Sequence, residues 1–253
     1  MPRPVGIQPM FDGLDAVVFK PKDGKDRPGL YLEECSYQAA KYAVEHWHYS
    51  GTLPSTILSL GVWEDGAFIG TIVFGRGATI SIGKTYGLEQ LQIAELVRVA
   101  LSRHRFQVSQ AIRVAGRLLK TAYPGTRLLI SYADSSKGHH GGIYQGAGWI
   151  FTGGSSDTGF IIHGRQFHRR SLGAYGFGAQ SVAWVRRHLD PNAEHIRMLP
   201  KYKYLLPLDS AMRAQIEPLR KPYPKCVGSA AVGTVADHAT GDGPNPIPTL
   251  RVP

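Results

Sequence analysis

Two β-like runs joined by a short polar turn constrain the fold of this chain more than any other feature. The runs ILSLGVW and AFIGTIVF lie within Ile57–Phe74, and Glu64-Asp65-Gly66 separates them. A turn of this composition between two such runs predicts a β-hairpin, and therefore an antiparallel pair of strands. Doubly wound nucleotide-binding folds have no antiparallel hairpin at the front, so they fit this chain less well.

Strands and helices alternate after the hairpin. Apolar runs at Leu96–Leu101 and Arg127–Tyr132 are typical of strands, and the apolar periodicity of Val108–Thr121 between them indicates a helix. A short helix at Gly142–Gly146 and a strand at Trp149–Thr152 follow. This order predicts an α/β (α+β) fold, a mixed sheet with an antiparallel front hairpin and flanking helices.

The segments around this core differ in character. Glu33–His48 carries an apolar or aromatic stripe at helical spacing, which predicts a helix. Residues 1–30 are rich in proline and glycine and have little periodicity, and residues 226–253 consist largely of small residues and prolines. We therefore expect an N-terminal extension (1–30), one domain (31–225) and a flexible C-terminal tail (226–253).

Positive charge is concentrated in the C-terminal part of the predicted domain. The chain has a formal net charge of +10, and residues 160–225 hold twelve Lys or Arg side chains against four Asp or Glu. Aromatic side chains are interleaved with them. This combination suits a nucleic acid, because phosphates are attracted by concentrated positive charge and release counterions on binding. A solvated basic surface without a partner is the alternative.

Composition excludes several classes of protein. No apolar run approaches the ~18 residues of a membrane-spanning helix, and the N-terminal MPRPVGIQPM has no apolar signal-peptide stretch. The two cysteines, Cys35 and Cys226, are too few for a disulfide scaffold or a cysteine zinc site. We expect a soluble, cytoplasmic protein without a membrane partner, in which a metal would need His, Asp, Glu or Tyr ligands.

Titratable side chains gather where the predicted elements end. The stretches that show this are His46-Trp47-His48-Tyr49-Ser50, Glu95-Leu96-Val97-Arg98, Ser131-Tyr132-Ala133-Asp134 and His139-His140-Gly141-Gly142-Ile143-Tyr144-Gln145. The ends of strands and helices in a mixed sheet converge on one crevice, where backbone groups lack partners. We expect the functional site in this crevice.

Single residues in these stretches keep structural alternatives. Asp134 follows a buried strand, where it can act as a general base or can instead cap a turn or helix. His48, at the end of a helix, can serve the site or only interact with the helix dipole. Arg98 faces an anionic ligand or an acid. Glu95 is not its automatic partner, because alternation along a strand places the two on opposite faces.

Four short segments of the sequence, taken in order, resemble one family. WHYSGTLP, ELVRVAL, SYAD followed by the pattern GHxGxIYQ, and KYKYLLPLD resemble the Mom proteins of bacteriophages, and the order of elements resembles the wider acetyltransferase-like superfamily. The resemblance runs from His46 to Pro207. It implies an enzyme of the host cytoplasm that converts adenine in double-stranded phage DNA to N6-carbamoylmethyl-adenine and so protects the DNA from host restriction.

The resemblance also implies roles for individual residues. The catalytic crevice would be lined by His48, Tyr49, Ser131, Asp134 and Tyr144. Donor binding would fall to Arg98, Arg103 and Arg105, and the DNA backbone would be held by Arg169, Arg170, Lys201 and Lys203. Iron has been associated with the family, and its candidate ligands here are His48 and Asp134.

The donor of the transferred group is left open by the sequence. The superfamily implies acyl-CoA, whose pyrophosphate is bound by free backbone amides of a glycine-rich loop at a helix N-terminus. The corresponding loop, residues 102–107, has no glycine, so its Arg103-His104-Arg105 run would instead hold a DNA phosphate or another donor. Two other functions are compatible with the sequence: an acyl-CoA-dependent N-acyltransferase acting on a protein or small amine, and a non-catalytic DNA-binding or virion protein. The oligomeric state is open, with a homodimer as one option.

Overall fold

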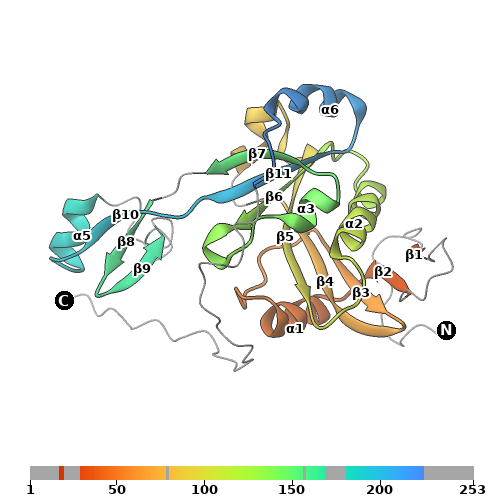
Figure 1. Cartoon of the computed structure of the whole chain (residues 1–253), viewed down its shortest axis with the longest axis horizontal. Helices are drawn as coiled ribbons and strands as arrows, with labels where there is room; N and C mark the ends of the chain where they lie inside the picture. The colour runs from red at the N-terminus through yellow and green to blue at the C-terminus, as the bar shows by residue number, and fades with distance from the viewer. Residues whose placement is uncertain are drawn as a thin grey trace.

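An eight-stranded mixed sheet forms the centre of the molecule (Figure 1). The computed structural model describes residues 17–19, 29–77, 80–155, 158–168, 172 and 181–224. In the order in which they lie side by side, the strands are β1 (Val17–Phe19), β2 (Leu30–Glu34), β3 (Leu58–Glu64), β4 (Ala67–Gly75), β5 (Ile93–Leu101), β6 (Leu128–Asp134), β11 (Lys201–Pro207) and β7 (Ile150–Ser155). The predicted mixed sheet is confirmed.

The predicted front hairpin is also confirmed. Strands β3 and β4 pair in antiparallel register, with Glu64 opposite Ala67. The two residues between them, Asp65 and Gly66, have φ angles of 51° and 86°. Positive φ at both central positions is what a two-residue hairpin turn of the right twist needs, and Asp-Gly is a favoured pair for it.

The first helix begins later than predicted. Helix α1 spans Tyr37–Trp47 and starts after Ser36, whose hydroxyl accepts a hydrogen bond from the Ala39 amide at 3.2 Å. Glu33 and Glu34 belong instead to β2, which pairs with β3 on one side and with β1 on the other. The prediction of a helix from Glu33 is therefore wrong. The reason is that strand pairing with β3 decides the conformation up to the Ser36 cap.

Helices cover both faces of the sheet. One face packs against α2 (Val108–Ala122) and α3 (Gly142–Gly146), whose buried residues share a core with alternate residues of β4 and β6. The opposite face packs against α1 and against α6 (Ser210–Ile216). Short 3₁₀ turns lie at Ile80–Tyr86, Gln90–Gln92, Ser135–Lys137 and Glu217–Leu219. None of the described helices is both long and apolar enough to cross a lipid bilayer.

The chain between β7 and β11 forms a small module of its own, which we call the inserted module. It contains β8 (Thr158–Ile162), β9 (Arg165–His168), α5 (Val182–His188) and β10 (Glu194–Arg197). Its strands form a separate sheet in the order β10-β8-β9. In Figure 1 the module extends away from the main sheet, at the left. Strand β11 then returns between β6 and β7, antiparallel to both.

Strands β5 and β6 diverge, and this divergence creates room for a site. They are the one parallel pair among the described strands of the main sheet, and they pair only from Ile93 opposite Leu128 to Glu95 opposite Ile130. Beyond this point β5 continues to Leu101 and β6 to Asp134 without pairing to each other. The two strands therefore open into a wedge.

Candidate active site

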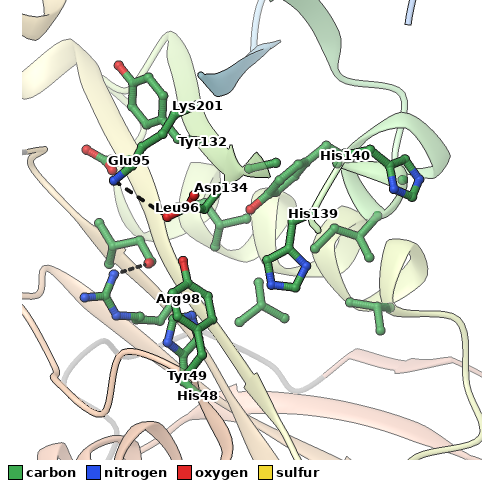
Figure 2. A pocket seen from close by; sticks show the side chains of 18 of the residues that line it. His48, Tyr49, Glu95, Leu96, Arg98, Tyr132, Asp134, His139, His140 and Lys201 are labelled. Atoms are coloured by element: carbon green, nitrogen blue, oxygen red, sulfur yellow. Dashed lines mark hydrogen bonds and ion pairs between the residues drawn. The ribbon is translucent and has the colours of Figure 1, made fainter. Parts of the chain in front are cut away.

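A cavity of about 880 Å³ lies in the wedge between β5 and β6. Its walls come from both strands, from the end of α1 and from the loop that leads into α3 (Figure 2). The predicted site residues that line it are His48, Tyr49, Arg98, Asp134, Tyr144 and Lys201. Segments far apart in the sequence thus meet at one place, as expected for the ends of elements in a mixed sheet.

His48 enters the cavity because α1 has already ended. Its backbone is extended, with φ −121° and ψ 130°, and its amide makes the last helical bond to the Val44 carbonyl. The Ser50 amide donates to His48 Nδ1 at 3.1 Å, so the proton of the neutral ring lies on Nε2. Burial, followed by the charges of Arg98 and His139, lowers the pKa of His48 to about 4. At neutral pH this ring is therefore an uncharged hydrogen-bond donor.

Tyr49 and His139 form an aromatic wall beside His48. The Tyr49 ring stacks on His48 with centroids 4.4 Å apart, and it lies 5.6 Å from the ring of His139. Tyr49 remains 59% exposed, so part of its ring can be reached by a ligand. Burial and the neighbouring charge of Asp134 raise its pKa. His139 was not among the predicted site residues, although the His-rich stretch that contains it was singled out.

Arg98 and Glu95 both line the cavity, contrary to the expectation from strand alternation. The pairing of β4 with β5 shifts register at this point, so that Val73 faces Arg98, Phe74 faces Leu96, and Val97 is an extra residue. A bulge of this kind changes which face the following side chains occupy. The Arg98 guanidinium donates to the carbonyls of Thr52 at 3.0 Å and Val97 at 2.7 Å, and is thereby fixed in the wall.

Burial lowers the pKa of Arg98, while Tyr49 and Glu95 raise it. An arginine retains its charge at neutral pH even with a lowered pKa. The wall of the cavity therefore carries a positive charge that is held in a fixed position.

Asp134 and Lys201 face each other across β6 and β11. The two residues are opposite in register, and Lys201 Nζ lies 4.0 Å from Asp134 Oδ2 (Figure 2). The other carboxylate oxygen, Oδ1, accepts from the amide of Ser136 at 3.0 Å and from its hydroxyl at 2.6 Å. Asp134 thus caps the following 3₁₀ turn, as one of the two interpretations has it, and it also lines the cavity. Lys201, predicted to hold the DNA backbone, lies in the cavity wall.

Ser131 and Tyr144 form a buried hydroxyl pair behind the cavity. Ser131 Oγ lies 2.8 Å from the Leu96 carbonyl oxygen and 2.8 Å from Tyr144 Oη. Ser131 is 1% exposed and is not among the lining residues, whereas Tyr144 reaches the cavity. Burial raises the pKa of Tyr144 to about 12, although the Ser131 contact lowers it. Tyr144 therefore keeps its proton at neutral pH, and its hydroxyl is engaged in the contact with Ser131.

Tyr204 of β11 fixes the loop that carries His139. Its hydroxyl donates to the His140 carbonyl at 2.5 Å and accepts from Gln145 Nε2 at 3.1 Å. Gly141 packs against the Tyr204 ring so closely that a Cβ there would lie 2.3 Å from it, and its φ is +83°. Through this contact the KYKYLLPLD segment, which contains Tyr204, supports the loop that lines the cavity.

Backbone amides of the loop before α2 already donate hydrogen bonds to an acidic side chain of the protein, Glu64. Glu64, which is 8% exposed, accepts hydrogen bonds at Oε1 from the amides of Arg105 and Phe106, both at 2.9 Å. The Arg105 side chain pairs with Asp65, and neither Arg103 nor Arg105 lines the cavity. The amides are thus not free to bind a pyrophosphate, and the acyl-CoA expected from the superfamily does not fit this loop.

The remaining predictions concern metal and DNA. Within the residues that the structure describes, no group of three His, Cys, Asp or Glu side chains is placed to hold a metal ion. His48 and Asp134 alone do not make an iron site. Lys203 lies away from the cavity, with Nζ 5.8 Å from the centre of the Tyr86 ring. Arg169 and Arg170 lie outside the described residues.

Comparisons with known proteins give the chain its place. The methylcarbamoylase Mom of Escherichia phage Mu is 26% identical over 204 residues, which cover 78% of this chain and 84% of the phage protein. A putative acetyltransferase from Acinetobacter baylyi ADP1 superposes with a TM-score of 0.42 and 13% identity, covering 79% of this chain and 99% of its own. FeeM, an N-acyl amino acid synthase from uncultured soil microbes, superposes with a TM-score of 0.40 and 15% identity, covering 76% of this chain and 96% of its own. The Mom protein family matches residues 29–225, and the chain belongs to that family.

Proposed function

We propose that this protein modifies adenine in double-stranded DNA at N6, forming N6-carbamoylmethyl-adenine in the cavity between β5 and β6. The observation that carries the proposal is the cavity itself, which joins an exposed aromatic wall to fixed charged groups in a member of the Mom family. A volume of about 880 Å³ is in the range of sites for drug-sized ligands, which is enough for a nucleobase and a small donor. The methylcarbamoylase of phage Mu supports the same reaction class.

The adenine must leave the duplex before it can react. Its amino group is paired and stacked in DNA, so enzymes that act on it turn the nucleotide out at a cost of about a few kcal/mol. Stacking of the base on Tyr49 and His139 would offset part of this free-energy cost, because an exposed aromatic ring stacks on any base. His48, with its proton on Nε2, supplies a hydrogen-bond donor at the same wall.

The cavity also holds groups suited to the transfer itself. In the proposed step, N6 forms a bond to the methylene carbon of an electrophilic carboxamidomethyl donor, and the leaving group departs with its electron pair. Asp134 accepts the proton that N6 gives up. Arg98, whose guanidinium is held in the cavity wall, offsets negative charge that develops on the donor as the leaving group departs. The amides bonded to Glu64 disfavour the alternative of acyl-CoA-dependent acyl transfer.

The proposal is tested by mass spectrometry of nucleosides from DNA of cells that express the protein. Wild-type protein is expected to produce an adenosine species heavier by a carbamoylmethyl group, and Asp134→Asn is expected to abolish it while DNA binding is retained. Asparagine keeps the oxygen that caps the turn at Ser136, so the fold is preserved. The control is Glu45→Gln, which alters an exposed acid on α1 outside the cavity.

Two results would contradict this account of the reaction. Only ordinary nucleosides in DNA from wild-type cells would overturn the proposed function. A wild-type level of product from Asp134→Asn would remove Asp134 from the chemistry while leaving the reaction in place.

A further inference from the structure

The inserted module begins and ends at the cavity. The chain leaves the main sheet at Ser155, the last residue of β7, and returns at Lys201, the first residue of β11. These two residues are opposite each other in register, and both line the cavity. Whatever occupies the mouth of the cavity therefore lies at the base of the module.

The module has a core of its own and does not use its charged surface for folding. Phe160, Ile162, Val185 and Ala193 are buried together, between its sheet and α5. Asp190 is also buried, and its carboxylate accepts hydrogen bonds from the amides of His163 at 2.7 Å and Asn192 at 2.9 Å. Backbone amides thus satisfy this acid inside the module.

The exposed surface of the module is strongly basic. Among its described residues the exposed arginines are Arg165, Arg186, Arg187 and Arg197, whereas the one exposed acid is Glu194. Arg186 has a structural contact, from Nε to the Ala193 carbonyl at 2.9 Å. Arg187 and Arg197 are exposed, and within the described part of the chain neither guanidinium makes such a contact.

We propose that the inserted module binds the phosphate backbone of the DNA whose adenine enters the cavity. The inference rests on the proposed function and adds the place where the duplex is held. Arginine side chains on a rigid module bind phosphates through charge and paired hydrogen bonds, and such contacts position a duplex without reading its sequence. Because the module is attached at Ser155 and Lys201, which line the cavity, it extends outward from the place where the base would be turned out.

The test compares DNA binding by full-length variants over a range of salt concentrations. Fluorescence anisotropy with a 30-base-pair duplex measures the affinity of wild type, of Arg187→Ala/Arg197→Ala, and of the matched control Arg117→Ala/Arg213→Ala. The control arginines are exposed on α2 and α6, far from the module. Circular dichroism and thermal unfolding verify that all three proteins are folded.

We expect the module variant to bind at least tenfold more weakly at physiological salt. The slope of log K against log salt should become shallower by about two, one unit for each phosphate contact removed. The control should match wild type. The inference would be overturned if the module variant had the same affinity and slope as wild type, or if wild type did not bind DNA. It would also be overturned if wild type bound poly-glutamate as tightly as it binds the duplex.

Nucleoside mass spectrometry separates this inference from the proposed function. Modified adenosine made by wild type, together with undiminished DNA affinity of the module variant, would leave the function standing and remove the module. DNA binding that depends on the module, without any modified nucleoside, would support DNA binding by the module and overturn the proposed function.

Discussion

His48 shows how the surroundings of one side chain decide what it can do in the site. Its position at a helix end left open whether it serves the site or only interacts with the helix dipole, and only the Ser50 amide bonded to Nδ1 reveals where its proton lies. Glu95 and His139 also line the cavity although neither was among the predicted site residues. Ideal alternation places Glu95 on the opposite strand face from Arg98, but the extra residue at Val97 brings both into the cavity. Local spacing cannot reveal a bulge that depends on the neighbouring strand.

The lowered pKa of His48 predicts a specific pH dependence of stability. Between pH 6.5 and about 4 the unfolded chain takes up a proton on this residue that the native protein does not, so the free energy of unfolding falls as the pH falls through this range. NMR titration of the His48 ring should give a pKa near 4. Chemical denaturation should show a smaller fall for His48→Gln than for wild type. A ring that titrates at 6.5 would contradict the account.

The elements that the sequence predicted best are those fixed by local pattern. The hairpin with its Asp65-Gly66 turn, the helix α2 and the buried strand β6 all appear where expected. Strand β11 was not predicted, although its KYKYLLPLD segment contributed to the family resemblance. Its place between β6 and β7 depends on pairing across more than forty residues of inserted chain, which no local periodicity reports.

Gly141 allows a test of how the loop before α3 is fixed. Alanine there would have to adopt φ +83° and would meet the Tyr204 ring at 2.3 Å. We expect Gly141→Ala to lower the free energy of unfolding by about 1–3 kcal/mol and to reduce activity, because His139 and Tyr144 flank this position.

The matched control for this variant is Gly125→Ala, since nothing lies within 4 Å of a Cβ at that position. It should change the unfolding free energy by less than about 0.5 kcal/mol. Equal stability of the two variants in urea denaturation would refute the proposed packing of the loop.

At the scale of the whole molecule, the inserted module, which carries part of the positive charge, is attached at the cavity. The concentration of positive charge in residues 160–225 could be read from composition, and part of it lies on the inserted module. The cavity could not be read in this way. Strands β5 and β6 both look like ordinary buried strands in sequence, and their separation after Glu95 and Ile130 exists only in the assembled sheet.

Photocrosslinking with a duplex that carries 8-azidoadenine tests most directly whether an extruded adenine enters the wedge between β5 and β6. Peptide mass spectrometry after irradiation should locate the crosslinks at Tyr49 or His139, and Tyr49→Ala should reduce their yield without abolishing duplex binding. Crosslinks found only on α2 or α6, with none at the cavity wall, would contradict the account.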